Sequence, residues 1–139
     1  MSDPIAPPAA RWPAEAAELV ALAVSDGDLG AALAQYELTA AFAPWAEDKS
    51  AVDMSTDQPA VRDIMSAIMQ LRLPLHTRLV ALLPADGLAM LVCERSIEGK
   101  GPDGAEVRLR GVGCTVVRPQ QDGSWRIAAD AWRLSEQPT

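Results

Sequence analysis

The chain has 139 residues, of which 49% are apolar and 22% charged, a balance typical of one globular domain with a substantial core. Its net charge of −7 argues against a nucleic acid or an anionic membrane surface as partner. No apolar run approaches the roughly 20 residues of a membrane helix, and the N-terminus lacks the basic and apolar regions of a signal peptide, so we expect a cytoplasmic protein.

Candidate metal ligands are scarce in this sequence. It has two cysteines, Cys93 and Cys114, one histidine, His76, and no Cys-x-x-Cys motif. Metal sites in proteins are usually built from several such residues at short spacing. We therefore predict reduced thiols and neither a metal nor another cofactor.

Proline is concentrated at the start of the chain. Residues 1–13 contain four prolines and several alanines, a composition that predicts a flexible N-terminal arm. The single domain is then expected over residues 14–139. Helical patterns with capping and stop signals predict a first helix over residues 14–26 and a second over residues 29–38.

The middle of the chain predicts one more helix. Residues 39–45 are typical of a short extended segment, and residues 46–57 of a polar, mostly acidic loop. Val, Ile and Met then recur at spacings of three and four over residues 59–71, with possible capping residues at 55–57. We interpret this apolar stripe as core packing.

The second half of the chain has the pattern of strands joined by tight turns. Each turn contains Gly with Asp or Pro, as hairpin loops do. The predicted strands cover residues 71–83, 88–99, 105–118 and 122–134. Three helices followed by an antiparallel meander predict an α+β fold.

Hairpin geometry suggests which side chains share a face. Centring each strand pair on its turn predicts that Leu83 faces Leu88, that Ile97 faces Arg108 and that Arg118 faces Trp125. A slip of one residue in any turn would exchange the faces of that strand. The predicted inner face holds Glu94, Gly111, Gly113, Thr115, Asp130 and Trp132. The predicted outer face holds Val80, Leu91, Val112, Cys114, Val116 and Ile127.

The predicted outer face is apolar and needs a cover. An antiparallel sheet normally has only one covered face, and the helices can supply only that one. We therefore predict a homodimer that packs through this outer face. A row of His76, Arg95, Arg110 and Arg133 would form its polar rim. Cys93 and Cys114 also fall on this face, too far apart for a disulfide, as small buried apolar groups.

A pocket is predicted on the inner face, around Asp130. Gly111 and Gly113 lie opposite Trp132 and Asp130, and glycine inside a strand leaves space. An apolar concavity with few polar groups matches a small-molecule site. The predicted ligand-binding residues are Tyr36, Trp45, Glu94, Thr115 and Trp132.

Two functions are compatible with such a pocket. A carboxylate between apolar walls suits proton transfer, so Asp130 could be the catalytic acid or base of a cofactor-independent isomerase, cyclase or hydratase that acts on an apolar metabolite. Alternatively, Asp130 is held by an arginine or by backbone donors without doing chemistry, Glu94 belongs to an ion pair with a neighbouring arginine, and the protein is a non-catalytic ligand-binding or dimerisation module.

Two segments of the chain are similar to a known superfamily. DGDLGAALAQYELTAAFAPW and GPDGAEVRLRGVGCTVVRPQQDGSWRIAADAWRL resemble the first helix–strand unit and the closing hairpin of SnoaL-like, nuclear transport factor two-like proteins. The resemblance extends over nearly all of residues 14–135. It implies a cone-shaped curved sheet wrapped around N-terminal helices, with a deep pocket and usually a dimer. Members include ketosteroid isomerases, polyketide cyclases and binding-only proteins.

The chain departs from the isomerase pattern at two places. Ala43–Pro44 stands where ketosteroid isomerases carry their general base, and Thr115 stands where they carry the aspartate of the oxyanion hole. The resemblance places Trp132 at an aromatic pocket-lining position and Asp130 where many members carry an acidic residue. It therefore does not imply the isomerase reaction with the usual residues.

Overall fold

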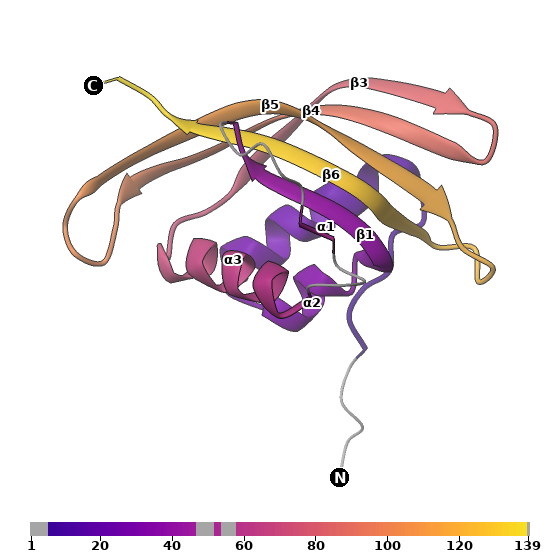
Figure 1. Cartoon of the computed structure of the whole chain (residues 1–139), viewed down its shortest axis with the longest axis horizontal. Helices are drawn as coiled ribbons and strands as arrows, with labels where there is room; N and C mark the ends of the chain where they lie inside the picture. Colours follow the sequence, from indigo (N-terminus) through magenta and orange to yellow (C-terminus); the bar gives the residue numbers. More distant parts are fainter. Residues whose placement is uncertain (1–5, 47–51, 54–57, 139) are drawn as a thin grey trace, which may run out of the picture.

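In the part of the chain that the structure describes, three helices cover one side of a curved six-stranded sheet (Figure 1). The computed structural model describes residues 6–46, 52–53 and 58–138. Its elements are α1 (Pro13–Asp26), α2 (Leu29–Leu33), β1 (Tyr36–Trp45), β2 (Val52–Asp53), α3 (Gln58–Gln70), β3 (His76–Ala85), β4 (Leu88–Lys100), β5 (Glu106–Pro119) and β6 (Trp125–Glu136). The strand order is β2-β1-β6-β5-β4-β3.

Helices α1 and α3 confirm the periodicity of the sequence. Pro13 opens α1, and Gly27 ends it in the left-handed conformation with φ of 71°. In α3 the stripe of Val61, Met65 and Ile68 is buried in the core. The predicted capping residues 55–57 lie outside the described residues.

The predicted second helix is too long. Asp28 caps α2 by accepting a hydrogen bond from the Ala31 N–H at 3.0 Å, but the helix ends at Leu33, and Tyr36 begins β1. Strand β1 pairs in parallel with β6, at the far end of the chain. Local periodicity contains no signal for a partner about 90 residues away, and this partner decides the conformation of the segment.

The predicted pairing is wrong in all three hairpins. Leu88 pairs with Ala85 and not with Leu83, and Trp125 pairs with Pro119 and not with Arg118.

Between β4 and β5 the predicted register is wrong by one residue. Ile97 pairs with Leu109 and not with Arg108. Because side chains alternate between faces, this slip turns Leu91 and Arg95 toward the helices and Glu94 to the outside. An irregularity in β6 likewise brings Ile127 into the core.

Gly111 and Gly113 allow a close approach of two strands and do not open the predicted cavity. A Cβ atom on Gly111 would collide with the carbonyl oxygen of Arg133, and one on Gly113 with that of Ala131. Arg133 has a positive φ of 57°, so β6 bends at this point. The glycines therefore admit the backbone of β6, and the prediction that they open a cavity is wrong.

The second half of the predicted flexible arm is attached to the domain. Ala10 is fully buried and forms a bridge with Trp125, whose N–H donates to the Ala10 carbonyl oxygen at 2.9 Å. The Gln35 side chain donates to the Pro8 carbonyl oxygen at 2.7 Å. The carbonyl oxygens of Pro8 and Ala10 thus accept hydrogen bonds from the domain, and these bonds hold this proline-rich segment in place.

The outer face of the sheet keeps exposed apolar side chains. Val112 and Leu83 are exposed, and Met90 and Val92 are half-buried between them. Cys114 is exposed on this face, whereas Cys93 is buried on the inner face, so only Cys93 fits the predicted small buried group. None of the helices in the described residues has the length and apolarity needed to cross a bilayer.

Candidate functional site

Asp130 lies at the centre of a buried hydrogen-bond network. Its Oδ2 accepts hydrogen bonds from the Tyr36 hydroxyl at 2.7 Å and from the Trp132 indole N–H at 2.8 Å. Its Oδ1 accepts one from the Thr115 hydroxyl at 2.7 Å. Three donors thus serve one carboxylate whose side chain has no solvent exposure, and these hydrogen bonds replace the water that burial removes.

Arg95 supplies the opposite charge in this network. Its Nη2 lies 3.8 Å from Oδ1 of Asp130 and donates to the Thr115 hydroxyl oxygen at 2.9 Å. Its guanidinium carbon lies 5.2 Å from the centre of the Trp132 ring, within the range of a cation–π contact. The side chain is 1% exposed, and Nη1 has no hydrogen-bond partner among the described residues. A buried charge is tolerated only when it is compensated in this way.

Aromatic rings fill the space beside the carboxylate. Phe42 meets Trp132 edge-on with ring centres 5.3 Å apart and meets Tyr36 edge-on at 5.9 Å. Burial, followed by the charge of Asp130 and the hydrogen bond to it, raises the pKa of Tyr36 well above its ordinary value. Tyr36 is therefore a neutral hydrogen-bond donor at physiological pH. These rings and donors enclose the Asp130 carboxylate, and none of the described cavities includes this residue in its lining, so the hollow around Asp130 stays a prediction.

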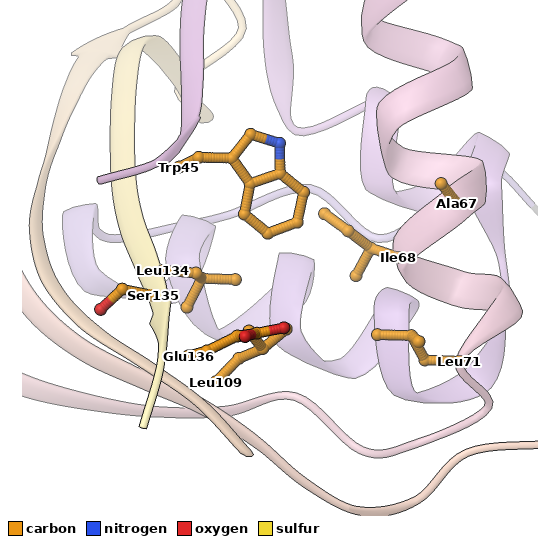
Figure 2. A pocket seen from close by; sticks show the side chains of 8 residues that line it. All are labelled: Trp45, Ala67, Ile68, Leu71, Leu109, Leu134, Ser135 and Glu136. Carbon is orange, nitrogen blue, oxygen red and sulfur yellow. The ribbon is translucent and has the colours of Figure 1, made fainter. Parts of the chain in front are cut away.

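A cavity lies at the other end of the inner face, between α3, the start of β5 and the end of β6 (Figure 2). Its volume is about 530 Å³. The lining residues are Trp45, Ala67, Ile68, Leu71, Leu109, Leu134, Ser135 and Glu136. Neither Asp130 nor any of its hydrogen-bond donors lines it.

The structure separates the predicted ligand-binding residues into three places. Tyr36, Thr115 and Trp132 meet at Asp130, and Trp45 lines the cavity. The prediction that Glu94 faces inward is wrong, because the register slip places it on the outer face. There Arg78 donates to its carboxylate at 2.7 Å, and this hydrogen bond lowers the pKa of Glu94.

The sequence reasoning missed Arg95 as an inner residue. Alternate residues of β4 are buried, and most of them are apolar: Ala89, Leu91, Cys93 and Ile97. Arg95 occupies the position between Cys93 and Ile97 in this series. A single charged residue among apolar residues at every second position indicates a buried charge, and this pattern could have identified Arg95 as a partner of Asp130. Among the residues that the structure describes, no three His, Cys, Asp or Glu side chains form a cluster able to hold a metal.

Comparison with known proteins finds likeness in structure only. No protein-family model matches the chain, and none of the curated proteins matches its sequence. A ketosteroid isomerase-like protein from Erwinia carotovora atroseptica superposes with a TM-score of 0.72 and 12% identity, over 91% of this chain and 94% of that one.

Two further solved structures carry quite different descriptions. A candidate calcium/calmodulin-dependent protein kinase type II association domain from Thiobacillus denitrificans has a TM-score of 0.70 and 15% identity, over 94% of this chain and 99% of that one. A candidate aromatic ring hydroxylase from Novosphingobium aromaticivorans has a TM-score of 0.69 and 16% identity, over 91% of this chain and 87% of that one. One architecture thus accompanies unlike descriptions. The helices, the curved sheet and these superpositions show that the chain has the SnoaL-like, nuclear transport factor two-like fold.

Proposed function

We propose that the protein binds a small apolar molecule in the cavity between α3, the start of β5 and the end of β6, without catalysing a reaction on it. The observation that carries this proposal is the cavity of about 530 Å³. That volume lies within the range of small-molecule sites, which are mainly apolar with a few polar groups. Here Trp45, Ile68 and Leu134 supply apolar walls, and Ser135 and Glu136 are the polar groups.

The packing of Asp130 supports a binding role over an enzymatic one. A catalytic acid or base has to come within hydrogen-bond reach of the substrate. The carboxylate of Asp130 is enclosed, and its oxygens already accept from Tyr36, Thr115 and Trp132. The catalytic role of Asp130 stays a prediction, and these contacts favour the alternative in which the residue stabilises the fold.

Calorimetric titration with a neutral bicyclic alcohol, 2-naphthylmethanol, tests the proposed site. Ala67 is exposed at the cavity wall, so Ala67→Trp can fill the cavity without disturbing the core. We expect binding to the parent and its loss in this variant. Arg62→Trp is the matched control, because Arg62 is exposed on α3 and lines none of the described cavities. Absence of binding to the parent, or equal binding to both variants, would reject the proposal.

The same proposal includes a homodimer through the outer face of the sheet. Val112 and Leu83 are exposed there, and ion pairs Arg78–Glu94 and Arg110–Glu98 bring both charge signs to the same strands. A face with both apolar and paired charged groups can match a second copy of itself across a two-fold axis. The description of one structural neighbour as an association domain agrees with assembly through this fold.

Sedimentation measurements on Val112→Asp test the dimer. A carboxylate at the centre of an apolar interface would be buried without a partner, so we expect the variant to be monomeric at concentrations where the parent is dimeric. Leu22→Asp, at an exposed position of α1, is the control and should leave the mass unchanged. A monomeric parent would contradict this part of the proposal.

A further inference from the structure

Glu136 lies where two cavities meet. The proposed binding cavity shares Leu71, Leu109 and Glu136 with a second cavity of about 300 Å³, which extends along the start of β5. Figure 2 shows the Glu136 side chain reaching over Leu109 into the space between β6 and α3. Glu136 comes from the last position of β6, where Leu109 is its partner on β5. Its carboxylate therefore stands beside whatever occupies the larger cavity.

The charges around this carboxylate are unbalanced. The eight residues that line the larger cavity include no lysine or arginine, so Glu136 is the charged one among them. In the second cavity, Arg108 directs its Nη1 to the Pro138 carbonyl oxygen at 3.3 Å, and Glu106 adds another carboxylate. Within the described residues, no cationic nitrogen lies within 4.0 Å of the Glu136 carboxylate. The whole chain adds a net charge of −7.

Trp45 adds a second feature that suits a positive charge. Figure 2 shows its indole directed into the same space, across from Ile68 and Leu134. The face of an indole attracts cations, and Trp is the best of the aromatic residues at this. The cavity thus combines apolar walls, one carboxylate and one indole.

We infer that the ligand of this cavity is a hydrophobic cation, such as an aryl or alkyl ammonium compound, whose apolar body lies between Ile68 and Leu134 and whose charged nitrogen is held by Glu136. This inference rests on the proposed binding function. Glu136 is exposed, so water screens its attraction. An exposed ion pair together with an exposed cation–π contact corresponds to a preference of roughly threefold to tenfold for the cation over a neutral ligand of the same shape.

A matched series of three probes tests the inference. These are 2-naphthylmethylamine, which is cationic at pH 7, the neutral 2-naphthylmethanol and the anionic 2-naphthoate, each titrated by calorimetry at low ionic strength. We expect the amine to bind roughly threefold to tenfold more tightly than the alcohol, and the carboxylate more weakly than both. Added salt should narrow these differences.

Substitution of Glu136 separates charge from shape. Glu136→Gln should reduce the preference for the amine to the smaller part that the Trp45 indole supplies, and an unchanged preference in this variant would also contradict the inference. Glu18→Gln makes the same change of charge at an exposed position of α1 and should preserve the preference for the amine. Equal or tighter binding of the alcohol or the carboxylate to the parent would overturn the inference and leave the proposed function intact. Absence of binding by all three probes would instead reject the proposed function itself.

Discussion

Substitution of Asp130 by asparagine distinguishes a structural carboxylate from a functional one. An amide has a single acceptor oxygen, so it cannot serve both Tyr36 and Trp132 on one side and Thr115 on the other in the way that the two carboxylate oxygens do. At least one buried donor has to lose its acceptor. The change also leaves the guanidinium of Arg95 buried without a negative charge.

The magnitude follows from the burial of both charged groups. Removal of one partner from a buried ion pair destabilises a protein by about 3–5 kcal/mol, because the other charge remains uncompensated. For a chain of 139 residues we expect a fall in the melting temperature of roughly 10–15 °C. Arg95→Met should cost a similar amount, and the double variant Arg95→Met/Asp130→Asn should cost less than the sum of the two.

Urea unfolding followed by circular dichroism measures these differences, with an unchanged m-value as the sign that only stability has changed. Glu94→Gln is the control, because its ion pair with Arg78 is on the surface, and it should leave the unfolding midpoint nearly unchanged. An Asp130→Asn variant as stable as the parent, or more stable, would refute this reasoning. That result would identify a carboxylate held at a cost to stability, as functional residues often are.

Three further results are expected. Tyr36 is the only tyrosine in the sequence, and its raised pKa means that the stability it contributes is complete below pH ~10 and is lost as the pH rises above that value. Phenolate absorbance should therefore appear together with unfolding, and phenolate absorbance in the native state would contradict the burial of Tyr36. Gly113→Ala should severely destabilise the protein, because the new methyl group meets the backbone of β6, whereas Gly30→Ala in α2 should be neutral or stabilising in the same melting assay. A thiol reagent should label Cys114 quickly and Cys93 only on unfolding, because burial raises the pKa of Cys93; two equally fast thiols would show that β4 has the opposite register.

Local patterns were sufficient for most elements and insufficient for their pairing. The apolar spacing of α3 and the Gly-containing turns of the meander predicted where helices and strands lie. The registers of the three hairpins could not be obtained in this way. The turn between Lys100 and Glu106, for example, can be closed with either parity, and the observed register of β4 against β5 differs from the predicted one by one residue. That one-residue difference exchanged Glu94 for Arg95 on the inner face.

The candidate site was predictable only in part for the same physical reason. Thr115 and Trp132 were assigned to the same pocket as Asp130, but the prediction placed Gly113 opposite Asp130, whereas the structure pairs Thr115 with it. Tyr36 was assigned to the pocket wall although it comes from a strand and not from a helix. The aromatic enclosure of Asp130 depends on Phe42, which comes from β1 and is brought there by the long-range pairing of β1 with β6. The separate cavity depends on how α3 lies over the sheet, which no local pattern specifies.

The parallel pairing of β1 with β6 has a consequence for biosynthesis. A ribosome releases β1 long before it has made β6, so the nascent chain must wait for about 90 further residues before that edge acquires its neighbour. Contacts so distant in sequence slow folding, and an unpaired strand edge invites aggregation in the meantime. We therefore expect that translation products lacking β6 will require chaperones, and that a chain containing β6 will acquire its native sheet only after that strand has left the exit tunnel.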